Sequence, residues 1–335
     1  MVNIKEVAKI TGYSIGTVSK ALNGYPDINE KTREKIQKAA NELGYVPSSF
    51  GQNLVSRKSY TVGIVFEENT GFGLAHPFFG ELLNVIKSEI EKQGYDILLL
   101  SKNVGTYVRS YLDHCIQKGV DGVMVLSAGL DTKNYQRLVE SKLPIVLIDF
   151  ENKEKNTVYT NNYSSTRSAV RYLIENNHKD IAYIKGDIYR FIGRERYSGY
   201  LDEMEESNLP INPEYIFDAF SYSTEDGIRV ADEIAKLDKK PTAVVCVADA
   251  VAIGLIKRLS ELNIKVPEEI SVIGFDDILL ANLINPALTT IAQDKGEIGR
   301  IASKLLIDNI LDKNLRPVNV QVEGKLIVRN TVKKL

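Results

Sequence analysis

Residues 3–24 read NIKEVAKITGYSIGTVSKALNG and decide the fold of the N-terminal region. Asn3 and Glu6 have the spacing of a capping box, so a helix is predicted to begin at Ile4. The run TGY breaks this helix, and Ser14 is placed to cap a second helix over residues 15–22. A third helix is predicted over residues 29–43. The side chains expected to face the common core are Ile4, Val7, Ala8, Ile10, Val18, Ala21, Leu22, Ile36, Ala39, Ala40 and Leu43.

Two short helices joined by a tight glycine turn predict a helix-turn-helix, whose second helix presents its N-terminal side chains to base edges in the major groove. The alternative is a small helical bundle with a purely structural role. Short polar side chains suit phosphate contacts, and outward side chains of the second helix suit base contacts. We therefore predict phosphate contacts by Ser14, Thr17, Ser19 and Asn23, base contacts by Ile15, Gly16 and Lys20, and a further place in the DNA-binding surface for Asn3.

The stretch IKEVAKITGYSIGTVSKALNG, followed by INEKTREKIQKAANELGYVP, closely resembles the DNA-binding domain of lactose/galactose-repressor-type (LacI/GalR) transcription regulators. The resemblance implies that the linker after this domain, residues 47–59, folds into a hinge helix on DNA. Leu54 would then wedge into the minor groove. An ordinary interdomain linker is the alternative. Gly51 stands where the family usually has Ala, and Lys20 where it commonly has Arg, whose two-pronged contact to guanine a single ammonium cannot make.

The 335 residues carry a nearly balanced charge, with a formal net charge of −2. The first 60 residues nevertheless hold nine Lys or Arg against five Asp or Glu, which suits binding of a polyanion by this end. Cys115 and Cys246 lack metal-ligand spacing and indicate reduced core residues of a cytosolic protein. We find neither an export signal nor an apolar run long enough for a membrane, so a cytoplasmic, nucleoid-associated protein is predicted.

From residue 60 onward, apolar strands alternate with amphipathic helices, which predicts an α/β fold of parallel sheets covered on both faces. Two doubly wound units are expected, the first over about 60–160 and the second over about 161–292. The tail, over about 293–328, is expected to return to the first unit. The resemblance adds that residues 60–335 form a two-lobed, periplasmic-binding-protein-like domain for effector binding and dimerisation, behind a DNA-binding domain at residues 1–46.

The usual enzyme motifs are not found in this sequence. A GxGxxG pattern starting at Gly71 would need Gly where His76 stands, and no Walker sequence occurs. The three histidines lack metal-ligand spacing. His114 and Cys115 are helix neighbours pointing about 100° apart, so a core Cys beside a surface His is expected. Asp276 and Asp277 are adjacent and are expected to point in different directions. We predict no catalytic residue, no metal and no cofactor.

Ligands of open α/β sheets bind beyond the carboxyl ends of the strands. Polar side chains that follow predicted strands are therefore the candidates for a cleft between the lobes. Carboxylate, guanidinium and amide groups can each bond two adjacent hydroxyls, as a polyhydroxylated ligand requires. For the aspartates, helix capping or a structural salt bridge is the alternative. These candidates are Asp149, Arg196, Asp249, Asp276 and Gln293.

The family resemblance extends this set of candidates. RERYSGY resembles the family's RxxGY segment and implies that Arg196 is the ligand guanidinium, while FDD implies that Asp276 is its carboxylate partner. HPFFGELL resembles the NPFF segment that closes one wall, and Tyr222 occupies a position where an aromatic ring often stacks on the ligand. Ala248 and Asp249 replace the family's usual Asn-Asp pair. The residues added by resemblance are His76, Phe78, Phe79 and Tyr222.

These observations together predict a homodimeric transcription regulator, most simply a repressor of a carbohydrate-utilisation operon. It would bind a pseudopalindromic double-stranded operator and respond to a sugar or sugar derivative in the cleft. Dimerisation is expected because one recognition helix contacts too few base pairs for useful specificity. Two alternatives stay open. One is a catabolite-control regulator of the same family that answers to a phosphorylated carrier protein, and the other is an α/β enzyme with a DNA-binding head.

Overall fold

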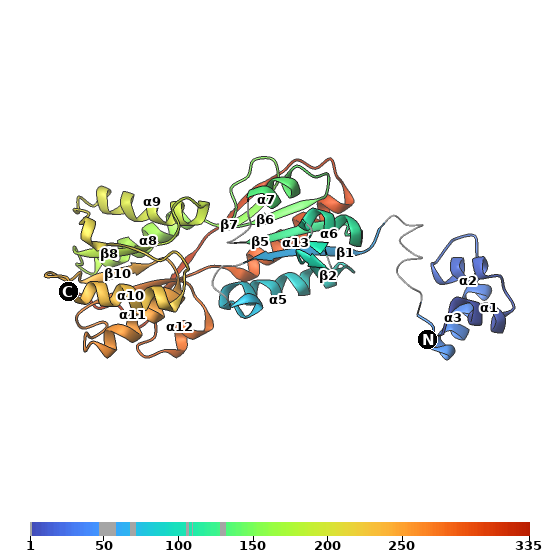
Figure 1. Cartoon of the computed structure of the whole chain (residues 1–335), viewed down its shortest axis with the longest axis horizontal. Helices are drawn as coiled ribbons and strands as arrows, with labels where there is room; N and C mark the ends of the chain where they lie inside the picture. Colours follow the sequence, from blue (N-terminus) through green and yellow to red (C-terminus); the bar gives the residue numbers. More distant parts are fainter. Residues whose placement is uncertain (1, 47–57, 68–71, 105–106, 109, 128–131) are drawn as a thin grey trace. The chain divides into compact units, whose positions relative to one another are not determined.

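The computed structural model describes residues 2–46, 58–67, 72–104, 107–108, 110–127 and 132–335. The chain divides into two compact units, Met1–Thr61 and Val62–Leu335, which we call the head and the body. Figure 1 shows the helical head and the two α/β lobes of the body along the chain.

The head contains three helices, α1 (Ile4–Thr11), α2 (Ile15–Leu22) and α3 (Glu30–Leu43). Local signals set their ends. The Asn3 side chain accepts from the backbone N–H of Glu6 at 3.3 Å, and the Glu6 carboxylate accepts from the Asn3 N–H at 3.4 Å, which completes the predicted capping box. Gly12 ends α1 in the left-handed region, with φ 76°. Ser14 caps α2 by accepting from the Thr17 N–H at 3.1 Å.

One core prediction for the head is wrong. Val7 and Ala8 are buried as expected, but Ile10 is exposed, and Thr11 takes the inner position instead. At roughly 100° per residue, Val7, Ala8 and Thr11 lie within a 100° sector, and Ile10 lies roughly 60° outside it. The Thr11 hydroxyl is satisfied there because it donates to the Val7 carbonyl at 2.7 Å.

The first lobe is built on a six-stranded sheet in which all described pairings are parallel, in the order β13-β7-β6-β5-β1-β2. Its strands are β1 (Thr61–Glu67), β2 (Asp96–Leu99), β5 (Gly122–Ser127), β6 (Ile145–Ile148), β7 (Asn156–Thr160) and β13 (Asn319–Val322). Helices α5 (Pro77–Lys92) and α13 (Lys295–Leu311) cover one face, and α6 (Tyr111–Lys118) and α7 (Thr132–Val139) cover the other. A 3-10 turn, η1 (Gly73–Ala75), precedes α5, and β3 (Asn103–Val104) pairs with β4 (Tyr107–Val108) in a small separate ladder.

Successive residues of the central strands face opposite layers. Met124 packs with the α5 and α13 side, whereas Val123 and Val125 pack with the α6 and α7 side. A strand buried on both faces needs this continuous run of apolar residues, which is why the sequence reads as uninterrupted hydrophobic blocks.

The second lobe has a sheet of the order β14-β12-β11-β10-β8-β9, parallel except for β14. Its strands are β8 (Ile181–Lys185), β9 (Ile216–Asp218), β10 (Ala243–Cys246), β11 (Ser271–Asp276), β12 (Thr289–Ala292) and β14 (Lys325–Ile327). Helices α8 (Asn162–Glu175) and α9 (Phe191–Glu206) pack on one face, and α10 (Thr224–Ala235) and α11 (Asp249–Glu261) pack on the other. The remaining pieces are η2 (Pro213–Tyr215) and the short helix α12 (Leu279–Leu283).

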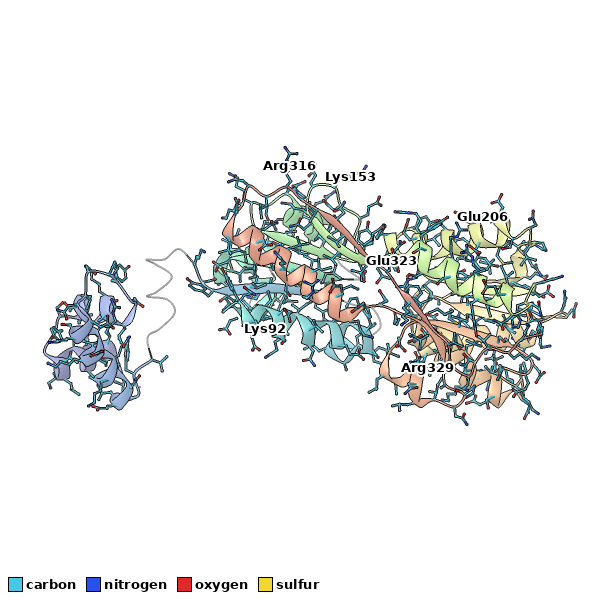
Figure 2. The ribbon with its side chains drawn as sticks, turned by 180° about the vertical axis from the view of Figure 1, so that it is seen from behind. Lys92, Lys153, Glu206, Arg316, Glu323 and Arg329 are labelled. Atoms are coloured by element: carbon cyan, nitrogen blue, oxygen red, sulfur yellow. The ribbon has the colours of Figure 1, made fainter. Side chains whose placement is uncertain are left out.

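The chain crosses between the lobes three times, after β7, after β12 and after β13. Glu323, labelled in Figure 2, lies at the third crossing. It accepts from Asn161 at 2.9 Å and from the Ser164 hydroxyl at 3.1 Å, which ties the third crossing to the first. The expectation that residues 293–328 all return to the first lobe is wrong at its end. Helix α13 and strand β13 do so, but β14 pairs antiparallel with β12 of the second lobe.

Candidate functional site

The exposed side of α2 carries the head's candidate contact residues. Ile15, Gly16 and Lys20 are all exposed, as reading base edges requires. The Ser14 and Thr17 hydroxyls lie 2.9 Å apart, and Asn23 donates to the Ser19 hydroxyl at 3.3 Å, so each of these polar groups is positioned by a neighbour on the same helix. Asn3 is exposed and caps α1. Leu54 and Gly51 lie outside the described residues.

Lys20 has a partner that the sequence did not suggest. Its ammonium group lies 2.5 Å from the carboxylate of Asp27, in the loop between α2 and α3. The hydrogen bond to Asp27 raises the pKa of Lys20 and lowers the pKa of Asp27. Both groups are therefore charged at neutral pH, and the base-reading candidate is paired in the DNA-free protein.

A cavity of about 330 Å³ lies between the two lobes of the body. The structure brings together at this cavity all but one of the predicted ligand residues: His76, Phe78, Phe79, Asp149, Arg196, Tyr222, Asp276 and Gln293. Asp149, Tyr222 and Asp276 have positive φ values of 64°, 55° and 119°. Non-glycine residues rarely adopt this conformation, and its clustering around one cavity is typical of functional sites.

The remaining lining residues were missed by sequence reasoning. Asp187 and Arg190 follow β8, so the rule that selected Asp149 would have found them. Phe220 and Ser221 follow β9, a three-residue strand that was not recognised. The others add apolar surface: Phe72, Pro77, Phe150, Phe191, Ile192, Ala248, Ala250 and Ile278. Of these, only Pro77, within HPFFGELL, and Ala248, in place of the family's usual Asn, stand at positions that the resemblance had pointed out.

Arg196 projects from α9 and is held on three sides. Its Nε donates to Asn162 at 2.8 Å and its Nη1 donates to the Val247 carbonyl at 2.6 Å. The guanidinium lies over the Phe275 ring, 3.6 Å from its centroid, which is a cation–π contact. Nη2 lies 3.9 Å from the Asp276 carboxylate, longer than a direct hydrogen bond. Arg196 therefore presents Nη2 in a fixed orientation beside Asp276.

Gln293 joins the cavity to the crossover between the lobes. Its amide nitrogen donates to the Asp276 carboxylate at 2.6 Å, and its amide oxygen accepts from the Thr160 hydroxyl at 2.6 Å. Thr160 ends β7 at the first crossing, and Gln293 follows β12 at the second. The carboxylate of Asp276 is thus connected through one side chain to two of the three segments that link the lobes.

Asp149 is the least satisfied polar group of the cavity. Its Oδ1 is buried and has no hydrogen-bond partner among the described residues. Burial raises the pKa of Asp149 to about 6, against the opposing effect of the Arg196 charge. Burial likewise raises the pKa of Asp276, again opposed by Arg196. A cavity with an unpartnered carboxylate oxygen favours a ligand that supplies a hydrogen-bond donor at that point.

Asp249 is not part of the cavity lining, so its prediction as a ligand residue is wrong. The side chain is fully buried, and it accepts from the Ile278 N–H at 2.9 Å and from the Thr290 hydroxyl at 2.5 Å. Burial is the main reason why the pKa of Asp249 lies well above its ordinary value, and the negative charge of Asp276 raises it further. As predicted, Asp249 lies at the carboxyl edge of the sheet. Its side chain, however, accepts hydrogen bonds from Thr290 on β12 and from Ile278 in the loop that follows Asp276.

Lys295, which the sequence analysis did not single out, reaches both lobes. Its ammonium group donates to the backbone carbonyls of Asp276 and Asp277 at 3.1 and 2.9 Å and lies 3.0 Å from the Glu81 carboxylate on α5. Arg329, labelled in Figure 2, secures the same loop through the Asp277 carboxylate at 2.7 Å. A lysine at the first position of a helix gave no sequence signal for this contact.

The other chemistry-bearing residues lie in structural positions. Cys115 and Cys246 are buried free thiols, and burial raises the pKa of Cys115 to about 12. His114 is buried rather than on the surface as expected, and its Nδ1 lies 3.0 Å from the Ser101 carbonyl. Across the described ranges, no group of three or more His, Cys, Asp or Glu side chains could hold a metal ion. Within those ranges, no helix is long and apolar enough to span a membrane.

Comparison with known proteins places the chain in a class of regulators. Residues 3–48 match the bacterial regulatory proteins, lacI family, and residues 170–332 match the periplasmic binding protein-like domain. The HTH-type transcriptional repressor PurR of Vibrio parahaemolyticus is 35% identical over 341 residues, covering 100% of both chains. PurR of Histophilus somni is 34% identical over 340 residues, again covering 100% of both chains. The chain therefore belongs to the lacI family of bacterial regulatory proteins.

Solved structures agree with this assignment. The transcriptional regulator CelR in complex with cellobiose is 26% identical, with a TM-score of 0.74, and the match covers 99% of this chain and 100% of CelR. The lac repressor dimer bound to operator and the anti-inducer ONPF shares the fold, with a TM-score of 0.85 at 23% identity and 99% coverage of both chains. The relatives are transcriptional repressors, so the protein is a DNA-binding regulator of this family and not an enzyme.

Proposed function

We propose that the protein is a sequence-specific repressor of transcription whose affinity for operator DNA changes when a small molecule occupies the cavity between its lobes. The observation that carries this proposal is the combination of a helix-turn-helix head with a cavity of about 330 Å³ that holds an unpartnered carboxylate oxygen on Asp149. Such a protein works in the cytoplasm, on the nucleoid.

The proposed DNA contacts are those of α2 and its flanks. Ser14, Thr17, Ser19 and Asn23 contact phosphates, while Ile15, Gly16 and Lys20 face base edges. Asn3, the exposed N-cap of α1, adds a further contact to the DNA, and Leu54 in the linker inserts into the minor groove. The exposure of the three base-reading residues supports this assignment.

The proposed effector is a sugar or sugar derivative, and the genes controlled serve carbohydrate use. Arg196 and Asp276 stand 3.9 Å apart with fixed orientations, so one ligand hydroxyl can accept from the guanidinium and donate to the carboxylate. Asp149 accepts from another hydroxyl, and Tyr222 packs on the apolar face of the ring. The cellobiose bound by the related regulator CelR supports this class.

A flat nitrogen heterocycle is the second candidate, because aromatic rings are numerous around the cavity. Phe72, Phe191, Phe220 and Tyr222 all line it and can sandwich a planar ring. Arg196 and Asp276 then contact ring acceptors and donors. Both of the relatives compared above, which match over the whole chain, carry the name PurR and no sugar name. A ligand panel must therefore include both chemical classes.

We propose a homodimer for two reasons: one head carries a single recognition helix, and α12 exposes an apolar surface. Leu279, Leu280 and Leu283 on this helix are 70%, 50% and 65% exposed, which is costly for a solvated surface. A second copy of the chain would cover them and would supply the second recognition helix that a two-half-site operator needs.

The test is a thermal-shift screen against sugars, sugar phosphates and purine bases, followed by operator-binding assays with each compound that stabilises the protein. A ligand present at 100 times its dissociation constant stabilises by about 2.7 kcal/mol. Arg196→Ala is expected to abolish the response of DNA binding to that compound while DNA binding itself persists. Arg300→Ala, at an exposed site on α13, is the control. Retention of the response in the Arg196 variant would contradict the cavity assignment.

A further inference from the structure

The ion pair between Lys20 and Asp27 lies on the surface proposed to read DNA. Lys20 is on the last turn of α2, and its ammonium group is 2.5 Å from Asp27. Their side chains are 50% and 51% exposed, so the pair stands in solvent and is accessible to a DNA duplex. A surface pair of this kind contributes little to stability, so the fold itself gives little reason for it.

The carboxylate of Asp27 is held at a defined place by the loop that carries it. Arg33 on α3 donates to the carbonyl of Tyr25, two residues before Asp27, at 2.8 Å. Ile28, just after Asp27, packs against the core of the head. The Tyr25 N–H also donates to the Lys20 carbonyl at 3.0 Å, which fixes the loop to the end of α2. Asp27 is therefore anchored on both sides, and it restricts where the ammonium group of Lys20 can point.

From this geometry, and resting on the proposed DNA-binding function, we infer that Lys20 and Asp27 read one base pair as a unit, which makes Asp27 a specificity-determining residue. Lysine alone is a flexible point charge that contacts phosphate as readily as guanine. The carboxylate orients the ammonium toward the acceptors of guanine, and its own oxygens can accept from the cytosine amino group in the major groove. A G·C pair satisfies both members.

The same arrangement discriminates against non-specific DNA. Phosphate contacts supply most of the affinity for random sequence, and a carboxylate beside the cation repels phosphate. Neutralising Asp27 frees Lys20 for the backbone. The expected consequence is tighter binding to random DNA, by about threefold to tenfold, and a dependence on salt that is steeper by roughly one unit.

The experiment is selection of binding sites by the full-length chain from a library of random double-stranded DNA, compared for the native protein, Asp27→Asn and Glu42→Gln. Glu42 is the matched control, because it also carries one negative charge of the head but pairs with Lys38 on its own helix α3. Circular dichroism establishes that each variant keeps its helices.

The native chain and the Glu42 variant are expected to select the same motif, with a strong G·C preference at one position of each half-site. The Asp27 variant is expected to lose that preference at this position alone, by about tenfold in enrichment. Lys20→Ala is expected to weaken the G·C preference at the same position. The variant that combines Lys20→Ala with Asp27→Asn is expected to match Lys20→Ala alone, because the two residues act together. Identical motifs from the native and Asp27 variants would overturn the inference. Failure of the native chain to select any motif would instead overturn the proposed function, and the inference with it.

Discussion

Lys295, in the first turn of α13, donates to the backbone carbonyl of Asp276 across the boundary between the lobes, at 3.1 Å. A cation is unfavourable at the N-terminal end of a helix, because the helix dipole is positive there. The Glu81 carboxylate at 3.0 Å offsets this cost, and the Lys295 side chain is only 12% exposed. The ammonium group thereby connects the loop that carries a cavity carboxylate to helix α5 of the other lobe.

Replacing Lys295 by Met should destabilise the body, since the change keeps the apolar stem but leaves two carbonyls and Glu81 without their donor. We expect a loss of about 1–3 kcal/mol in the free energy of unfolding, measured with urea. Lys304→Met on the same helix removes an exposed pair with Asp308 and should cost less than about 0.5 kcal/mol. Equal losses for both variants would show that the contact of Lys295 across the lobes stabilises the protein no more than an exposed surface pair does.

Asp149→Asn should stabilise the ligand-free protein above pH 6. The folded-state pKa of Asp149 is about 6, above the ordinary 3.8, so the charged carboxylate is unfavourable in the fold. As the pH falls through 6, the folded protein takes up a proton that the unfolded chain does not, and this cost disappears. The advantage of the variant should therefore be full at pH 7–8 and vanish near pH 4. Urea unfolding across this range measures it, and an advantage independent of pH would contradict the assignment.

His178 should produce the opposite pH dependence. It is fully buried, with Nδ1 3.0 Å from the Thr242 hydroxyl and Nε2 3.0 Å from the Lys333 carbonyl. Burial lowers its pKa below the ordinary 6.5, so below that pH the unfolded chain binds a proton more readily than the folded one. The native protein should thus lose stability relative to His178→Gln as the pH falls from 7.5 to 5. A constant difference between the two proteins would refute this.

Leu283→Arg should convert the proposed dimer into monomers, because a charge would replace one of the exposed leucines at its interface. Light scattering after size-exclusion chromatography gives the molecular mass directly. Leu311→Arg, at an exposed leucine at the end of α13, should leave the dimer intact. A native protein that elutes as a monomer, or a Leu283 variant that stays dimeric, would count against α12 as the interface.

The features best predicted from sequence are those that depend on residues close together in the chain. Asn3 with Glu6, and Ser14 with Thr17, define helix starts within four residues, and both hydrogen-bond patterns are present. The position of Ile10 was wrong because a helix of eight residues leaves the direction of its inner face weakly determined. The alternation of strands and helices was sufficient to predict the two doubly wound sheets.

The sequence predicts which edge of the sheets faces the cavity, but not which side chains at that edge point into it. Asp149, Asp249 and Asp276 all stand at the carboxyl ends of strands, yet only Asp149 and Asp276 line the cavity. The positive φ values of those two turn their side chains, and no local pattern encodes that choice. Lys295 was missed for a related reason. Its partners lie at Glu81 and at Asp276–Asp277, and such distant contacts exist only after both lobes have formed.

The exchange of strands at the end of the chain sets the order in which the protein can be completed during translation. Strand β13 becomes the edge of the first sheet and β14 the edge of the second, so both sheets wait for residues 319–327. The three-helix head is a compact unit of its own and can fold while the ribosome is still making the body. A nascent chain would therefore carry a folded DNA-binding head before residues 319–327 complete the two sheets that support the ligand cavity.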